Sequence, residues 1–428
     1  MTCREEQMMA ETVKEITRGL RVGIVGGSIA GCTAAIELVR LGCEVTLFER
    51  TGEELKDRGA GIGVPPSVID TFITRDLVDA DTPYFSSPAF TRLWRTARER
   101  RYGYLAWDQP ASLALLNWGV LFRNLRKRVP NQVYRTEQRV VALHEQGTGS
   151  VGVELADGAV HEFDLVVCAD GYTSLGRRAL FPEVAIHYAG YVIWRGFLLE
   201  QELEESQPLE RGVRCLGYPG GHGIFYFVPG PDGSVAPGKR LVNWGMYLPV
   251  AERTLPDFLT DKEGKAREGS LPPGAMPVAT ETSLKQQART CIPDYYAEIV
   301  TKSENTFVYA IYDCQVPAYR KGRICLAGDA GAYARPHSAA GALKGINDAI
   351  ALAEALHTYQ SLDEALTDWD KTQTETNNNL VRFGNQLGRA LVTEIPDWSS
   401  MDATGMEKWF TSIVTIHTEM LDSKTPRT

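Results

Sequence analysis

The clearest pattern of apolar and polar positions lies near the start of the chain. An apolar run at Arg21–Val25 is followed by a glycine-rich turn at 26–31 and by apolar residues at helical spacing as far as Leu41. Gly42 ends that spacing, and a second apolar run follows at 45–48. Two short apolar runs on either side of a helical pattern predict a strand, a helix and a parallel strand, which together form a βαβ unit.

The turn and the second strand of this unit carry residues that suit a dinucleotide. Ser28 takes the place of the middle glycine of a GxGxxG pattern, and Glu49 stands 18 positions beyond Gly31. This spacing puts a pyrophosphate on the helix N-terminus and a ribose on the carboxylate. We predict a site for NAD or FAD, in preference to a strand–turn–helix that binds nothing. Its predicted residues are Gly26, Ser28, Ile29, Ala30, Gly31, Glu49 and Arg50.

Two later strands are also predicted to deliver aspartates. A hairpin around Asp157-Gly158 precedes an apolar run at 164–169, which ends at Asp170. Another apolar run at 324–327 leads to Asp329, and a helical pattern opens near Ala340 and Gly341. A carboxylate beside a positive helix end suits a flavin, which has ribityl hydroxyls to donate and a ring edge that becomes anionic on reduction. The ordered set of motifs therefore favours FAD.

The middle of the chain changes from helical spacing to strands rich in aromatic residues, separated by loops with proline and glycine. We predict an α/β fold, α+β overall, in which a Rossmann-like FAD-binding domain carries an inserted, mostly antiparallel β-sheet for substrate and a helical C-terminal end. The predicted parts are an extension at 1–20, an FAD-binding domain at 21–85, 108–180 and 316–390, a substrate domain at 86–107 and 181–315, and a helical segment at 391–428.

Composition limits the classes of partner. The 428 residues carry a formal net charge of −9, which argues against a phosphate-backbone surface and hence against nucleic acid. No apolar run approaches the roughly 20 residues that span a bilayer, and the first 20 residues lack the features of a signal or transit peptide. The eight cysteines form no CxxC pair, and no cluster has metal-ligand spacing. We expect a cytoplasmic protein without a metal.

With these motifs in order, the chain resembles the class A flavoprotein monooxygenases, the single-component aromatic hydroxylases. The resemblance runs from about Arg21 to about Leu356 and rests on the loop at 26–31, Asp170-Gly171 and Gly328-Asp329. Runs at 188–196, 228–233, 243–247 and 335–344 narrow it to the 2,6-dihydroxypyridine 3-monooxygenase branch. Two positions depart from the family pattern, since Leu343 replaces a glycine and Trp118 replaces an arginine that many members carry.

The resemblance implies a reaction and further site residues. NADPH or NADH would reduce FAD, and dioxygen would add at flavin C4a to give a hydroperoxide that hydroxylates an electron-rich aromatic or N-heteroaromatic ring. The nicotinamide is expected on the surface near Asp170, Arg177 and Arg178. The further cofactor residues implied are Arg58, Gly61, Asp170, Asp329, Pro336, Ala340, Gly341 and Ala342.

Three residues are predicted to act on the substrate. In a strand, His222 and Tyr226 share one face about 13 Å apart, so they could flank one ring. His337 follows Pro336, which in the family lies close to the reactive flavin carbon. A histidine that titrates near neutrality suits removal of the substrate's hydroxyl proton. Structural roles for all three remain open.

Two other functions remain open. The first is a flavin-dependent epoxidase or oxidative cyclase of a secondary metabolite, which needs no base and a larger apolar pocket. The second is a nucleotide-binding sensor without enzyme activity, because a fold alone does not determine function. The sequence identifies neither the ring that is oxidised nor the choice between NADPH and NADH. It also leaves the oligomeric state open, a homodimer included.

Overall fold

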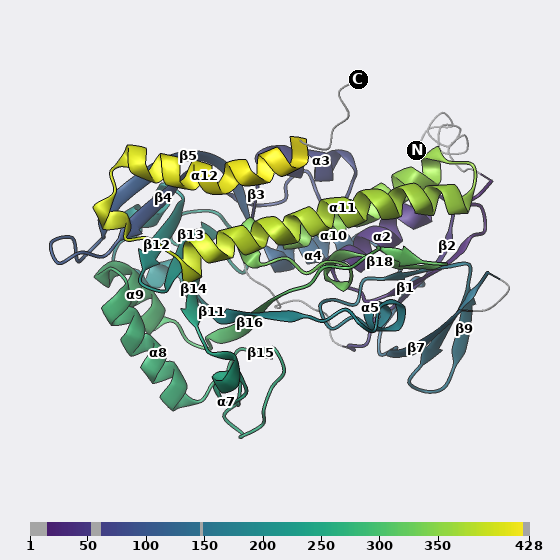
Figure 1. The fold of residues 1–428 in the computed structure, drawn as a ribbon, viewed down its shortest axis with the longest axis horizontal. Coiled ribbons are helices and arrows are strands. Elements are labelled where there is room, and N and C mark those ends of the chain that lie inside the picture. The colour runs from purple at the N-terminus through teal and green to yellow at the C-terminus, as the bar shows by residue number, and fades with distance from the viewer. Residues whose placement is uncertain (1–14, 53–60, 146–148, 423–428) are drawn as a thin grey trace.

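The computed structural model describes residues 15–52, 61–145 and 149–422. Two sheets lie side by side along the long axis, as Figure 1 shows, with the strands near the N-terminus at one end and a larger sheet at the other. Within the described residues, no helix is both long enough and apolar enough to cross a membrane. The arrangement is the predicted α/β fold with a second, mostly antiparallel sheet.

The first sheet has six strands and is parallel except at one edge, where β17 pairs antiparallel with β18. Its central strands are buried on both faces, as expected of a parallel sheet covered by helices. Its strands, in order across the sheet, are β17 (Arg320–Lys321), β18 (Ile324–Leu326), β10 (Leu165–Cys168), β1 (Arg21–Val25), β2 (Glu44–Phe48) and β6 (Tyr134–Arg135).

The second sheet has nine strands, and all its neighbouring pairs are antiparallel except β12 with β4. Its strands, in order across the sheet, are β15 (Ser270–Leu271), β16 (Phe307–Asp313), β11 (His187–Leu199), β14 (Leu241–Pro249), β13 (Gly221–Val228), β12 (Val213–Tyr218), β4 (Phe85–Trp94), β5 (Tyr104–Asn117) and β3 (Gly61–Val64).

Alternation along these strands separates a packed face from a face that lines a cavity. Trp194, Phe225 and Trp244 point to the face covered by two helices, α8 (Val278–Cys291) and α9 (Asp294–Lys302), and belong to its apolar core. Residues an odd number of positions away, such as Ile193 and Tyr247, point to the other face and line a cavity. A period of two therefore assigns the aromatic strands to both core and cavity.

The predicted hairpin around Asp157-Gly158 is present in a third, three-stranded sheet of β7 (Val140–Glu145), β8 (Val151–Leu155) and β9 (Val160–Phe163). The helices of the described residues are α2 (Ile29–Arg40), α3 (Pro66–Thr74), α4 (Trp118–Arg128), α5 (Leu175–Leu180), α6 (Gln207–Glu210), α7 (Leu255–Phe258), α8 (Val278–Cys291), α9 (Asp294–Lys302), α10 (Gly341–Thr358), α11 (Leu362–Gly388) and α12 (Ala403–Asp422).

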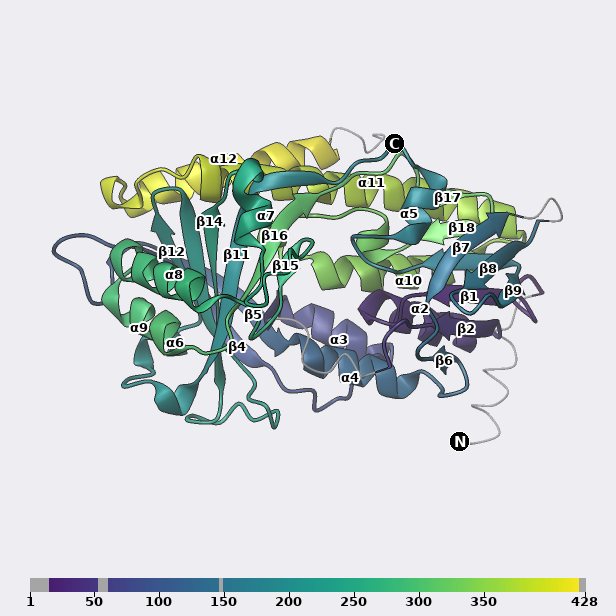
Figure 2. The ribbon, with the colours of Figure 1, turned by 90° about the horizontal axis from the view of Figure 1, so that it is seen from below.

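The two C-terminal helices link the halves of the molecule. In Figure 2, α11 runs beside the six-stranded sheet and α12 continues along the nine-stranded sheet. The turn between them includes Trp398, which is fully buried and contacts Trp94 of β4 at a ring-centroid distance of 5.9 Å. The chain end predicted as a helical segment thus packs against the substrate-side sheet.

Two segments predicted within the FAD-binding domain pair in the nine-stranded sheet instead. Gly61–Val64, which falls in the predicted range 21–85, is the edge strand β3 and pairs with β5. The part of β5 after Asp108, assigned to the FAD-binding domain, pairs with β4 in the nine-stranded sheet. Both errors arise because pairing between distant segments, rather than local pattern, decides which sheet a strand joins. Arg58 lies outside the described residues.

The turn between β1 and α2 shows why glycine is required there. A Cβ on Gly31 would lie 1.9 Å from the carbonyl oxygen of Gly26, far inside van der Waals contact. Gly26 itself has a φ of 100°, a left-handed conformation that glycine adopts readily. These two glycines let the first turn of α2 approach the end of β1.

Gly31→Ala is therefore expected to lower the free energy of unfolding of the apoprotein by about 1–3 kcal/mol, because the added methyl group overpacks a rigid turn. Gly341→Ala is the matched control, since a Cβ there meets no atom within 4 Å. Urea unfolding of both variants measures the difference. Equal stability of the two variants would show that the turn relaxes without cost.

Candidate functional site

The predicted acidic residues meet at one edge of the six-stranded sheet. Strands β1, β2, β10 and β18 are parallel, so their carboxyl ends lie together. Gly26, Glu49, Asp170 and Asp329 each follow one of these strands within three residues. In an open α/β sheet, ligands bind at this edge, where the strand order reverses.

Two adjoining cavities open at this edge, of about 430 Å³ and about 680 Å³. They share Ser28, Trp118, Ala169 and Gly171, so together they form one elongated site. Of the predicted cofactor residues, the smaller cavity is lined by Ser28, Ile29, Ala30, Gly61, Asp329, Pro336, Gly341 and Ala342, and the larger by Gly26, Ser28, Glu49, Arg50 and Asp170.

The larger cavity contains the βαβ turn. The carboxylate of Glu49 accepts a hydrogen bond of 2.8 Å from the Gly27 N–H, and Tyr134 donates to the Gly27 carbonyl at 2.9 Å. Ser28 precedes α2 without a side-chain hydrogen bond that caps the helix. The first N–H groups of α2 therefore face the cavity without a side-chain cap, next to an acidic residue.

Asp170 lies where the two cavities join. One of its carboxylate oxygens accepts from the Leu175 N–H at 2.6 Å, while Oδ1 is buried without a hydrogen-bond partner. Burial raises the pKa of this carboxyl above its usual range. A buried oxygen without a partner is costly, so it marks a place for a donor such as a ligand hydroxyl.

The smaller cavity is bounded on one side by Asp329, whose side chain remains 38% exposed. Behind it, the fully buried amine of Lys344 lies 3.2 Å from Asp329 Oδ1. Asp348, also buried, accepts from the Gly328 N–H at 2.8 Å and from Asn377 at 2.7 Å. Burial raises the pKa of Asp348 to about 6, and Lys344 partly opposes that rise. This network holds the loop that carries Asp329.

The N-terminus of α10 also faces this cavity. Ala340 precedes the helix without a side-chain cap, and Ala339 adopts a left-handed φ of 54°. Gly341 and Ala342, in the first turn, line the cavity. The positive end of an 18-residue helix thus points toward a site whose opposite side carries Asp329.

These features fit FAD. Two uncapped helix ends suit a pyrophosphate and a flavin ring edge, and the buried oxygen of Asp170 and the half-exposed Asp329 suit hydroxyl donors. The bulk of Trp118, which departs from the family pattern, lines both cavities and stacks on Phe122 at a centroid distance of 5.3 Å.

Arg177 was predicted to lie on the surface and contact the nicotinamide, but it is buried. It is 1% exposed, and its guanidinium donates to the carbonyls of Tyr172, Asp329 and Ala330. It therefore joins the Asp170 loop to the Asp329 loop. Arg178 is exposed and lines the larger cavity. A run of two arginines cannot show which of them points inward.

The three predicted catalytic residues are placed differently from one another. His222 and Tyr226 share one face of β13, as expected, and Tyr226 lines the smaller cavity. Its hydroxyl, however, donates to the Gly61 carbonyl at 2.9 Å. Neither His222 nor His337 is among the described residues that line either cavity. Both histidines pack on the ring of Tyr247, at centroid distances of 4.5 and 4.3 Å.

Both histidines are held neutral. His222 Nδ1 lies 3.1 Å from the Leu391 carbonyl, and burial lowers the pKa of this histidine to about 3. His337 Nε2 lies 2.9 Å from the Tyr191 hydroxyl, its Nδ1 has no partner, and burial lowers its pKa well below the usual value. A histidine with so low a pKa is a weak proton acceptor. Their role as catalytic bases stays a prediction without support from this geometry.

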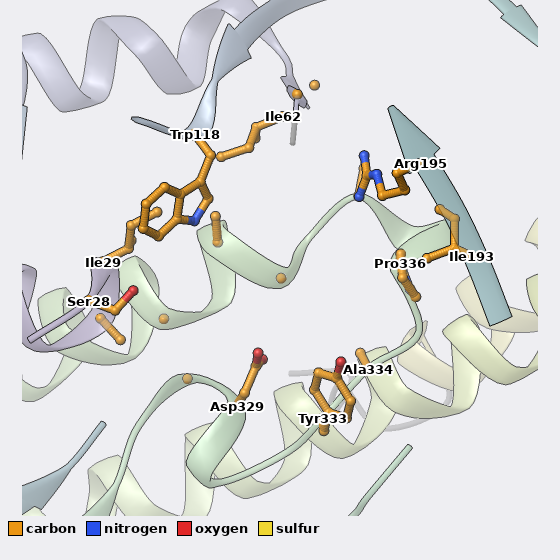
Figure 3. Close-up of a pocket in the computed structure, with 18 of the residues that line it drawn as sticks. Ser28, Ile29, Ile62, Trp118, Ile193, Arg195, Asp329, Tyr333, Ala334 and Pro336 are labelled. Carbon is orange, nitrogen blue, oxygen red and sulfur yellow. The ribbon is translucent and has the colours of Figure 1, made fainter. Parts of the chain in front are cut away.

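Sequence reasoning missed several residues that line the smaller cavity. Figure 3 shows Tyr333 beside Asp329, and Arg195 extending from β11 on the opposite side. Ile193 and Arg195 are two apart on β11 and so share its cavity face. That alternation is the signal that could have identified Arg195 once the register of the strand was known.

Comparison with known proteins points to the same class of protein. The family model described as "Pyridine nucleotide-disulphide oxidoreductase" matches residues 21–62, and the one described as "FAD binding domain-like" matches residues 188–313. The chain is 28% identical to 2,6-dihydroxypyridine 3-monooxygenase of Paenarthrobacter nicotinovorans, with 83% of this chain and 87% of that protein covered. It is also 28% identical to a 3-amino-4-hydroxybenzoate 2-monooxygenase of Streptomyces platensis, over 78% and 79% of the two chains.

Solved structures show the same likeness. The 2,6-dihydroxypyridine-3-hydroxylase of Arthrobacter nicotinovorans superposes with a TM-score of 0.78 at 26% identity, covering 87% of this chain and 92% of that one. A salicylate hydroxylase bound to its substrate gives a TM-score of 0.70 at 20% identity over 94% and 97%, a likeness of fold alone.

Fold, cavities and relatives together define a flavoprotein oxidoreductase whose cofactor is FAD. More narrowly, the chain is similar to the class A flavin monooxygenases in sequence and fold, and it is an FAD-dependent monooxygenase.

The buried histidine gives a prediction about pH. The pKa of His222 is about 3 in the folded protein and about 6.5 when exposed, so protonation favours unfolding as the pH falls below 6.5. Between pH 7.5 and pH 5 this should cost about 2 kcal/mol. His222→Asn, whose amide can still donate to Leu391, should lose less stability over this range than the wild type.

Chemical unfolding of the FAD-loaded protein at the two pH values measures this difference. His357→Asn, at an exposed position of α10, is the matched control and should keep the wild-type loss. An unchanged pH dependence in His222→Asn would mean that the folded protein accommodates the protonated ring.

Proposed function

We propose that this protein hydroxylates a small, electron-rich aromatic or N-heteroaromatic ring, phenol-like or hydroxypyridine-like, with FAD, dioxygen and NADPH or NADH. The observation that carries the proposal is the smaller cavity. It extends from Asp329 and α10, beside the six-stranded sheet, to an apolar wall on the nine-stranded sheet. That wall contains Phe90, Leu113, Leu115, Ile193, Ile224 and Tyr247. A flat, mostly apolar space beside the cofactor edge suits a planar ring.

The geometry supports an assignment of the residues that would hold FAD. The N-terminus of α2 at 26–31 would face the pyrophosphate and Glu49 the adenosine ribose, with Arg50 nearby. Asp170 and Asp329 would accept from ligand hydroxyls, and the end of α10 at Gly341 would face the flavin ring. When bound, FAD supplies acceptance of hydride from the nicotinamide and activation of dioxygen.

The chain's own residues would bind the ring, orient it and exclude water. The aromatic and aliphatic wall removes solvent from the space beside the cofactor, which strengthens every polar contact there. Tyr226 fixes the start of β3 by its hydrogen bond to the Gly61 carbonyl, and Gly61 lacks a Cβ that would lie 2.6 Å from the tyrosine ring. The wall is thus rigid where a substrate would contact it.

The relatives weigh against the epoxidase or oxidative-cyclase alternative more than the cavity does. The names of the relatives above, which refer to dihydroxypyridine and aminohydroxybenzoate, support a single-ring substrate. Cytoplasmic location and a homodimeric state stay predictions.

The test is turnover with probe rings. The purified protein should be yellow when loaded with FAD, and 2,6-dihydroxypyridine or salicylate should accelerate its oxidation of NADH or NADPH. Under ¹⁸O₂ the product should carry one labelled oxygen atom. Protein that binds FAD but oxidises the nicotinamide at the same slow rate with every phenol or hydroxypyridine would exclude this substrate class.

A further inference from the structure

Arg195 stands out among the residues of the smaller cavity because it brings a charge to an otherwise apolar wall. It lies on β11, two positions after Ile193, and both side chains line the cavity. Its partner on the neighbouring strand β14 is Gly245. A Cβ on Gly245 would lie 3.0 Å from the Ile193 side chain and 3.6 Å from that of Arg195. The missing side chain leaves room for Ile193 and Arg195 to extend over the sheet.

The charge of Arg195 has no counter-ion among the described residues. Its Nε is buried without a hydrogen-bond partner, and the titratable side chains beside it are Tyr226, whose hydroxyl contacts the guanidinium, and Tyr247. Two other cations near the site lie beside carboxylates, since the half-buried Arg335 lies 2.6 Å from Asp313 and the buried Lys344 lies 3.2 Å from Asp329. A half-buried guanidinium that lines a cavity without an anion favours a ligand that supplies one.

The residues near Arg195 are poorly suited to act as a base that removes a proton from a neutral substrate and so makes it an anion. Tyr226 already donates its hydroxyl hydrogen to Gly61, and His222 and His337 lie outside the described cavity wall. Burial lowers the pKa of both histidines, so neither readily holds a proton taken from a substrate. A ring that arrives already ionised, with its proton left in the solvent, needs no base at this wall.

We propose that Arg195 binds the substrate by an anionic oxygen, so that the ring enters the cavity as an oxyanion rather than as a neutral phenol or pyridinol. The proposal rests on the function proposed above and specifies its substrate further. Charge-assisted contact to a guanidinium is strong and directional, so it also orients the ring. The anionic oxygen is either a ring oxygen, which also raises electron density on the ring, or a carboxylate attached to it.

The experiment measures binding without turnover. FAD-loaded enzyme, kept anaerobic and without nicotinamide, is titrated by calorimetry with 2,6-dihydroxypyridine, with salicylate and with the neutral 2,6-dimethoxypyridine. The variants are Arg195→Gln, Arg195→Lys and, as the matched control, Arg289→Gln on the exposed side of α8. Flavin absorbance confirms equal FAD content in all of them.

Arg195→Gln, which removes the charge, should lower the affinity for 2,6-dihydroxypyridine roughly 30-fold or more. Truncation of one partner of a desolvated charge pair has an effect of this size. Arg195→Lys should recover part of that loss, the neutral ether should change less than about threefold, and Arg289→Gln should match the wild type. Weakening of salicylate alone would assign the contact to a carboxylate, and weakening of both probes to a ring oxygen.

Two results would overturn the proposal, and they differ from failure of the proposed function. If Arg195→Gln binds the anionic probes as tightly as the wild type does, Arg195 has no part in substrate binding. The proposed hydroxylase function would still stand. Equal weakening of the neutral ether and the anionic probes would show a role in shape alone. Wild-type enzyme that takes up FAD but binds neither 2,6-dihydroxypyridine nor salicylate would overturn the proposed substrate class and the role of Arg195 together.

Discussion

The buried ion network around Lys344 is the constraint on which the site depends. A lysine amine with no exposed surface is ion-paired with Asp329, while Asp348 accepts a hydrogen bond from Gly328 in the loop that carries that aspartate. Taking these charges out of water is costly, and their mutual attraction offsets that cost only while they stay close together. The network therefore favours the observed arrangement of the Gly328–Ala330 turn and the first turns of α10. The position of the carboxylate that faces the cavity follows from that arrangement.

Two sheets with different tasks meet across this fixed edge. The parallel sheet supplies helix N-termini and carboxylates, which suit the polar parts of a dinucleotide, while the antiparallel sheet supplies a flat apolar wall. Arg177 ties two cofactor loops together from beneath, and the π-helical turn at Arg389–Thr393 closes against His222 of the other sheet. Both walls of the cavity are therefore held by contacts that lie outside it. Charge is placed at two sides of it, with Asp329 matched by Lys344 and Arg195 left for a ligand.

Local pattern was enough to predict the parallel edge. The runs that end at Gly26, Asp170 and Asp329 are short and apolar, and parallel strands bring their carboxyl ends together whatever the rest of the chain does. The other sheet was harder to predict in detail. Its aromatic strands were predicted, but β3 was assigned to the FAD-binding domain because its pairing with β5 joins segments about 50 residues apart. The histidines were given a role from their spacing, yet their burial depends on Leu391 and Tyr191, which no local pattern connects to them. Arg195 was overlooked for the same reason, since its lack of a counter-ion appears only after packing.

The most direct test of this account is the FAD affinity of Lys344→Met, measured by flavin fluorescence on apoprotein whose folding is confirmed by its unfolding curve. If the buried amine holds Asp329 in place for the cofactor, the FAD affinity of Lys344→Met should be roughly 30-fold or more below that of the wild type. The FAD affinity of Asp329→Asn should fall by a similar factor. The double variant should then be no weaker than either single one, because the two residues act as a unit. Lys371→Met on the exposed side of α11 is the control. Affinity of Lys344→Met within about threefold of the wild type would contradict the account.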